Sequence, residues 1–194
     1  MNFIKKLLNI PIKEDKEIQK QEVNLSLDDS FVHNFIEKGG KFLYCLKEEE
    51  IKENLQKVIT ENNWSDILLL EPKISSFLKG TNVQILTKLD STTPVLTTCE
   101  HLIADNGDIL FSSNQLKSRK LSELSEDFIV YATTSQLVKD TGQGLTGIKT
   151  NSKSALPTNI SAIKNYGENK NDDNFLNYGN NNTKNLYLLL LEDL

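Results

Sequence analysis

Two rhythms of apolar positions run along the chain, and each predicts a different kind of element. Over 48–62 apolar residues recur every three or four positions, the spacing of a helix with one buried face. They are Ile51, Leu55, Val58 and Ile59. Short continuous apolar runs instead indicate strands buried on both faces. We predict such strands at 41–45, 66–70, 83–86, 128–133, 160–163 and 185–192.

Helix signals lie between the first three of these strands. Asp28-Asp29-Ser30 offers N-caps for a helix with an apolar stripe, and Gly39-Gly40 stops it. Pro72 suits the first position of a short helix. Helices and strands therefore alternate up to residue 86. This order predicts an α/β fold with a mainly parallel sheet and helices on both faces, that is, three layers α/β/α.

The pattern changes after a turn predicted at 90–94. Asn106-Gly107 separates apolar runs at 102–105 and 108–112, which predicts a type I′ hairpin that inserts antiparallel strands and makes the sheet mixed. We expect a short helix over 134–139 and a loop around Gly142, Gly144 and Gly147. The spacing of these glycines formally fits GxGxxG, but they do not directly follow a strand, so the nucleotide-binding signal is weak.

The length of 194 residues indicates one domain over 28–194, preceded by a tail or linker over 1–27. Apolar residues at helical spacing near the start fit a loosely docked helix, or one that contacts a membrane or partner. Residues 165–182 hold eight Asn among eighteen, so we expect a mobile surface loop there.

Charge and hydropathy limit the partners and the location. The net charge is −5, which argues against nucleic-acid binding. The longest apolar run, 186–191, is too short to span a membrane. The N-terminal segment has lysines within its apolar stretch and no small-residue cleavage site, so it does not fit a secretory signal. We expect a cytoplasmic protein.

The cysteines argue against a cofactor cluster in this chain. Cys45 and Cys99 are 54 residues apart, and the sequence has no CxxC and no Cys/His cluster. An iron–sulfur or zinc site generally needs four ligands at short spacings. We therefore expect no metal and no cofactor in this chain. Both cysteines have apolar neighbours and fit buried thiols in a reducing compartment.

Two carboxylates near the predicted hairpin are catalytic candidates. Asp105, at the hairpin mouth, is placed to orient a substrate hydroxyl or act as a general base. Glu100 is a second carboxylate near the same place. The alternatives are turn chemistry for an Asp before Asn-Gly and a solvated loop position for Glu100. Gly107 is a candidate for substrate contact through the same turn.

Cations and hydroxyls supply candidate binding groups. Arg119, the sole arginine, and Lys117 suit a carboxylate or phosphate, with ordinary surface charge as the alternative. Thr133, Thr134 and Ser135 follow a buried strand, where open α/β sheets bind ligands. Plain N-capping is the alternative for these three residues.

One stretch resembles a known family. The run TTCEHLIADNGDILFSS at 97–113 resembles the signature of the LUD-domain family, the lactate-utilisation protein C group. Lys117-Ser118-Arg119 stands where that family has Gly-Arg, and 128–135 and 185–192 resemble its later strands. The chain departs from the family at Asp105, where Glu is usual, at Ser118, and at 165–167, where the family often has Gly-Pro-Ser.

The resemblance implies a fold like that of CoA transferases, ribose-phosphate isomerase and folate cyclo-ligase. It also implies a non-redox subunit or accessory of lactate utilisation, in which iron–sulfur partner proteins take the electrons during oxidation of lactate to pyruvate. The alternative is an independent small-molecule-binding protein or enzyme of that structural group, acting on an anionic metabolite. A purely structural partner protein is a third hypothesis.

Overall fold

Helices and strands alternate through the first half of the chain, as the apolar pattern predicts. The computed structural model describes residues 26–88, 91–117, 119–152, 156–167 and 182–193. The first elements are α2 (Leu27–Glu37), β1 (Lys41–Cys45), α3 (Glu48–Glu61), β2 (Asp66–Leu69), the 3₁₀ helix η1 (Pro72–Leu78) and β3 (Gln84–Leu86). The predicted tail and most of the asparagine-rich loop, at 1–25 and 168–181, lie outside the described residues.

The second half contains more strands than helices. Its elements are β4 (Val95–Thr98), β5 (His101–Ile103), β6 (Asp108–Ser112), α4 (Ser113–Leu116), η2 (Leu121–Glu123), β7 (Asp127–Thr133), η3 (Thr134–Gln136), β8 (Leu137–Val138), α5 (Thr141–Asn151), β9 (Ile160–Ile163) and β10 (Asn185–Leu191). The sequence pattern did not predict β4, α4 or β8. The helix predicted over 134–139 is wrong beyond Gln136, because the chain there pairs with β5 as β8.

Six parallel strands form the main sheet, in the order β1-β10-β7-β4-β2-β3. Its layering explains the continuous apolar run of β10. Leu186, Leu188 and Leu190 belong to the core on one face, while Tyr187 and Leu189 belong to the core on the other. A strand buried on both faces has no polar side to expose.

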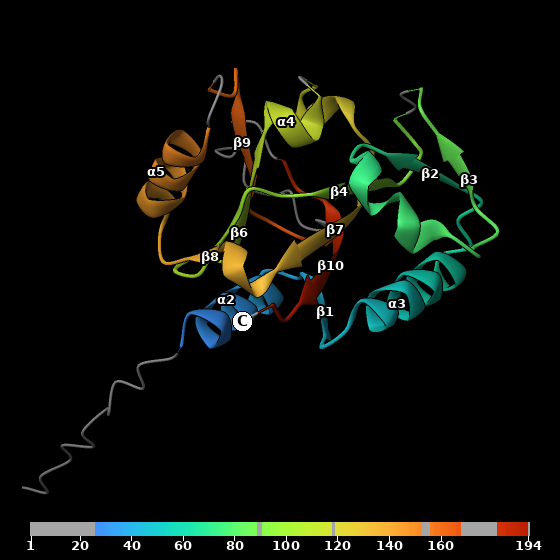
Figure 1. The fold of residues 1–194 in the computed structure, drawn as a ribbon, viewed down its shortest axis with the longest axis horizontal. Helices are drawn as coiled ribbons and strands as arrows, with labels where there is room; N and C mark the ends of the chain where they lie inside the picture. The colour runs from blue at the N-terminus through green and yellow to red at the C-terminus, as the bar shows by residue number, and fades with distance from the viewer. Residues whose placement is uncertain (1–25, 89–90, 118, 153–155, 168–181, 194) are drawn as a thin grey trace, which may run out of the picture.

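Helices cover both faces of this sheet. The buried residues of α3 and η1 pack on one face, and those of α2 pack on the other. The predicted α/β architecture with a mainly parallel sheet is confirmed. Figure 1 shows α3 and α5 at opposite sides of the molecule. On the face covered by α2, residues of β5 and β6 share the core with the helix.

The hairpin joins a second sheet rather than the first. Strands β5 and β6 pair antiparallel as predicted, but they lie in a four-stranded sheet of order β8-β5-β6-β9. The six-stranded sheet therefore remains fully parallel. The hairpin turn is also not type I′. Gly107 has φ of +69°, Asn106 is not among the described residues with positive φ, and Gly107 N–H donates to Ile103 O at 2.8 Å across a four-residue loop.

The glycines at 142–147 lie in helix α5, so the predicted loop is wrong. Asp140 caps this helix by accepting a hydrogen bond from Gln143 N–H at 2.9 Å. A Cβ at Gly144 would lie 2.9 Å from Leu110 Cδ1, and one at Gly147 would lie 2.8 Å from His101 Nε2. The glycines therefore let α5 approach the second sheet closely and are not a phosphate-binding loop.

The start of α2 also differs from the prediction. The N-cap is Ser26, whose side chain accepts a hydrogen bond from Asp29 N–H, rather than a residue of 28–30. Asp28 and Asp29 instead occupy the first turn, where negative charge is favourable. The predicted stop is confirmed, because Gly39 follows the C-cap with φ of +89°.

Candidate functional site

The carboxyl ends of the central parallel strands bring several candidate residues to one edge of the main sheet. In register, Leu191 of β10 lies beside Thr133 of β7, and Thr98 of β4 lies beside Tyr131. Thr133, Thr134 and Ser135 therefore come where open α/β sheets hold ligands.

Asp193 meets these residues from the segment after β10. Its Oδ1 accepts hydrogen bonds from Ser135 N–H and from Thr134 Oγ1, both at 2.8 Å. Its Oδ2 accepts one from Ser135 Oγ at 2.7 Å. The Asp193 carboxylate thus accepts hydrogen bonds from Thr134 and Ser135, which were predicted to bind an external anion.

These contacts set the protonation of Asp193. Desolvation alone would raise its pKa, but the hydrogen bonds from Ser135 and Thr134 outweigh it and lower the pKa to about 2. The carboxylate therefore stays charged at neutral pH. A ligand anion at this turn would have to displace it.

Gln136 connects this turn to Glu100. Its Oε1 accepts a hydrogen bond from Thr133 N–H at 2.9 Å, and its Nε2 donates to Cys99 O at 2.6 Å and to Glu100 O at 3.2 Å. The carboxylate of Glu100 accepts from Ser112 Oγ at 2.5 Å. Glu100, Ser112 and the turn after β7 therefore form one hydrogen-bonded cluster.

The thiol of Cys99 lies within the same region but is not poised to react. Burial raises its pKa far above the ordinary value, and the charge of Glu100 raises it further. Cys45, on β1, is also buried, and burial raises the pKa of its thiol. Both thiols stay protonated, as expected for core cysteines.

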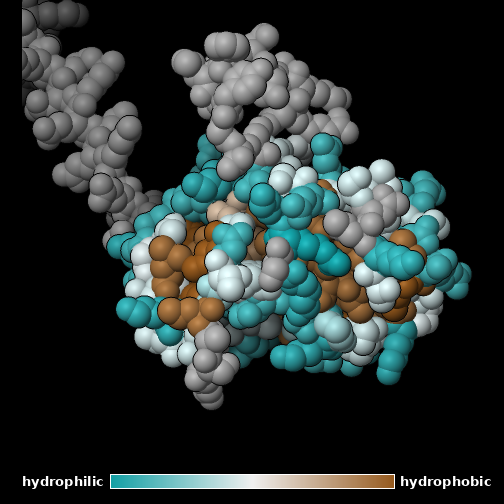
Figure 2. Space-filling model, turned by 90° about the horizontal axis from the view of Figure 1, so that it is seen from above, coloured by the Kyte–Doolittle hydropathy of each residue, from teal (hydrophilic) through white to brown (hydrophobic). Residues whose placement is uncertain are grey.

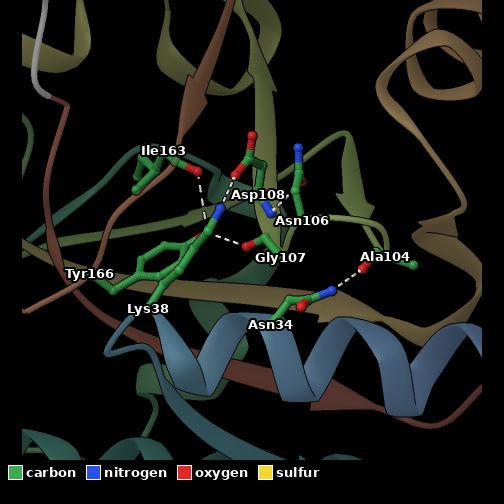
Figure 3. A network of polar contacts seen from close by, with 8 residues as sticks. All are labelled: Asn34, Lys38, Ala104, Asn106, Gly107, Asp108, Ile163 and Tyr166. Atoms are coloured by element: carbon green, nitrogen blue, oxygen red, sulfur yellow. Dashed lines mark hydrogen bonds and ion pairs between the residues drawn. The ribbon is translucent and has the colours of Figure 1, made fainter. Parts of the chain in front are cut away.

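Asp105 lies at the other end of β5 from Glu100, in the exposed part of the hairpin loop. Its backbone N–H donates to Lys139 O at 2.9 Å. Asn34 of α2 fastens the loop by donating from Nδ2 to Ala104 O at 2.8 Å, as Figure 3 shows. The structure thus separates the two candidate carboxylates with a strand.

Gly107 brings the loop against α2. A Cβ at this position would lie 2.6 Å from Phe35 N, in addition to the positive φ. Close packing thus accounts for the glycine at this position, because a side chain there would push the hairpin away from α2.

An ion pair between the half-buried Lys38 and the buried Asp108 holds the same hairpin. Lys38 Nζ contacts Asp108 Oδ1 at 2.8 Å, and Asp108 N–H donates to Asn106 Oδ1 at 3.0 Å. Tyr166 reaches in from beyond β9 and donates its hydroxyl to Gly107 O at 2.6 Å (Figure 3). Burial raises the pKa of Tyr166 well above its usual value, and the charge of Asp108 adds to this, so the phenol stays a donor.

Lys117 and Arg119 follow α4 and are not joined to the cluster by hydrogen bonds. Lys117 has φ of +52° and donates from Nζ to Asn114 O at 2.8 Å. Arg119 is half-buried, and its guanidinium has no hydrogen bond or ion pair with any described residue. Among the described residues, no hydrogen bond or ion pair therefore connects Arg119 to the turn after β7.

A family model, the LUD domain, matches residues 29–191. The chain belongs to the LUD-domain family. The resemblance found in 97–135 is thereby confirmed, and the family is associated with lactate utilisation. No curated protein matches the chain.

A solved structure agrees with this fold. The crystal structure of a DUF162 family protein from Deinococcus radiodurans matches with a TM-score of 0.60 over 87% of this chain and 99% of that one. The two sequences are 14% identical, so this likeness concerns the fold.

In this LUD domain, the sequence pattern did not predict two residues of the hydrogen-bonded cluster. Asp193 and Gln136 belong to no recognisable motif. Asp193 contacts Ser135 because β10 pairs with β7. The usable signal is the strand alignment: polar residues just beyond two buried strands meet when the strands are neighbours.

Two features are absent from the described part of the LUD domain. No group of three or more His, Cys, Asp or Glu side chains there is arranged to hold a metal ion. None of the helices described is long and apolar enough to cross a membrane.

Proposed function

We propose that this LUD-domain protein supports the oxidation of lactate to pyruvate in the cytoplasm as a component without its own redox centre. The family match over 29–191 carries this proposal. Oxidation of lactate releases two electrons and two protons, so an acceptor is required. An iron–sulfur cluster usually takes four cysteine ligands, whereas this chain has Cys45 and Cys99 in two separate cores. The acceptor is then a cluster on a partner protein.

A purification from the native cells tests this role. The tagged full chain is isolated anaerobically, and the eluate is assayed for iron and for lactate-dependent dye reduction. We expect an iron-containing partner and dye reduction that disappears in a deletion strain and returns with the wild-type gene. Unchanged growth on lactate and unchanged dye reduction after deletion would contradict the proposal.

The second candidate function is an independent protein that binds or converts an anionic metabolite. It is favoured by Arg119, whose guanidinium has no hydrogen bond or ion pair with the described residues. Purified protein is titrated with coenzyme A, a folate and a sugar phosphate. Binding that falls in Arg119→Ala and partly survives in Arg119→Lys, which keeps the charge but loses the planar fork, supports it. Absence of binding, or binding unchanged in Arg119→Ala, counts against it.

A further inference from the structure

A polar cavity of about 540 Å³ lies between η2 and the outer edge of β9. This volume is in the range of sites that hold small organic molecules. Its lining includes Lys120 and Ser122 from the η2 side, Ser161 and Ala162 from β9, and Lys164. None of these residues belongs to the cluster at the carboxyl end of the main sheet.

Among the described residues that line this cavity, the positive charge has no compensating carboxylate. Lys120 and Lys164 contribute two ammonium groups, and no Asp or Glu is among the described lining residues. Neither ammonium group makes a hydrogen bond or ion pair with another described residue. The carboxylate of Glu123 accepts the backbone N–H of Lys120 at 3.1 Å and does not line the cavity. In a chain of net charge −5, this is a local positive site.

The edge of β9 adds neutral donors. Asn159 O accepts from Ser113 N–H, on the β6 side, at 3.0 Å. Backbone groups of an antiparallel strand alternate in direction, so those of Ala162 point to the free edge, where the cavity lies. Asn182 donates from Nδ2 to Ala162 O at 3.4 Å. The N–H of Ala162 thus faces the side of β9 on which the cavity lies, and Ser161 and two lysines line the same cavity.

We propose that this cavity is a binding site for a small hydroxylated organic anion bearing phosphate or carboxylate groups. Ammonium groups bind the charged oxygens, while the hydroxyls and the strand-edge N–H bind the remaining oxygens. The other occupant to consider is an acidic peptide that adds a strand to β9. The small anion is favoured because the Asn182 side chain already binds Ala162 O and interrupts the ladder that an added strand needs.

Two probes distinguish the anionic group. Ribose 5-phosphate carries phosphate and hydroxyls, and citrate carries carboxylates and a hydroxyl. Each is titrated into the full chain by calorimetry, with sodium chloride holding the ionic strength constant, because screening weakens non-specific attraction. We expect saturable binding of at least one probe, and a rise in Tm at saturation.

Charge-matched variants locate the binding. The double variant Lys120→Gln/Lys164→Gln should bind the probe at least tenfold more weakly. The control Lys73→Gln/Lys149→Gln removes the same charge from η1 and α5 and should bind as the wild type does. Circular dichroism and Tm without ligand show that both double variants are folded.

Three results would overturn the inference. These are no saturable binding of either probe, an equal loss in both double variants, or binding of an extended oligo-aspartate peptide without either probe. The inference goes beyond lactate oxidation and does not depend on it. Lactate-dependent dye reduction is measured in the same variants, so loss of one property without the other separates the two proposals.

Discussion

At the scale of single residues, several polar side chains around the candidate residues bind other groups of the chain itself. Asp193 holds the turn after β7, Tyr166 holds the hairpin, and Gln136 connects Glu100 to Thr133. A side chain that resembles a catalytic candidate in the sequence can therefore be a tether. Each tether can be tested by removing its polar atom.

Asp193→Asn should destabilise the fold at pH 7, by at most about 1 kcal/mol because Asp193 is exposed and solvent screens its charge. That corresponds to a Tm lower by roughly 2–4 °C. The folded-state pKa, about 2, is below the ordinary 3.8, so the charged form contributes stability above pH 3.8. The difference from wild type should shrink as pH falls from 3.8 to 2, measured by thermal unfolding.

Glu53→Gln is the control for this pH dependence, since Glu53 is exposed on α3 and its carboxylate has no hydrogen bond or ion pair with a described residue. Its Tm should follow that of the wild type across the range. An Asp193→Asn difference that persists unchanged at pH 2 would show that its hydrogen bonds do not depend on the charge.

Tyr166→Phe should cost roughly 1–3 kcal/mol of unfolding free energy, because it leaves Gly107 O without the donor that approaches it at 2.6 Å. Urea denaturation measures the loss. Tyr44→Phe is the matched control, since the Tyr44 hydroxyl donates to Glu192 at the exposed surface. Equal effects in the two variants would refute a tethering role for Tyr166.

At the scale of elements, local pattern predicted most of the helices and strands described. The helix over 48–62 and the strand over 108–112 could be predicted because their signals, apolar spacing and a turn, lie in neighbouring residues. Helix α5 was missed because three glycines lower its intrinsic propensity, and packing against Leu110 and His101 compensates. The second sheet was missed because it needs β8 and β9, distant in sequence from the hairpin.

The candidate site was predictable only in part, for the same reason. The position of Thr133–Ser135 after a buried strand is a local signal. That Glu100 joins them through Gln136, while Asp105 lies at the other end of β5, depends on how the second sheet packs. No short motif encodes that packing.

The turn after α2 yields a test of close packing. Gly39→Ala should destabilise strongly, because the residue has φ of +89° and its Cβ would overlap Tyr166 O. Gly80→Ala is the control: φ is +90° there, but no heavy atom lies within 4 Å. The control should lose roughly 1–2 kcal/mol from backbone conformation. Gly39→Ala should lose clearly more in urea denaturation. Equal losses of unfolding free energy in the two variants would mean that the Tyr166 carbonyl moves aside without cost.

At the scale of the whole molecule, one sheet separates two cores. Cys45 belongs to the core beneath α3, and Cys99 belongs to the core beneath α2. Figure 2, seen from the side of α4, shows hydrophilic residues across the middle of that surface and hydrophobic areas on either side. The sheet strands are shared by both cores, so we expect the cores to unfold together.

The two thiols report on this cooperativity. A thiol reagent should modify neither Cys45 nor Cys99 in the native protein, because both are buried and protonated. In increasing urea, mass spectrometry of the labelled peptides should give the same midpoint for both. Labelling of Cys45 well before Cys99 would show that the α3 side opens as a separate unit.

The position of β10 has a consequence for biosynthesis. β10 lies between β1 and β7, and it is the strand with which β1 pairs, across more than 140 residues of sequence. While a ribosome is still translating the intervening codons, β1 has an empty place beside it and the central hydrophobic strand is missing. Until then the nascent chain has exposed strand edges, and such edges favour chaperone binding. Completion of the sheet becomes a late event, coupled to release of residues 185–191 from the exit tunnel.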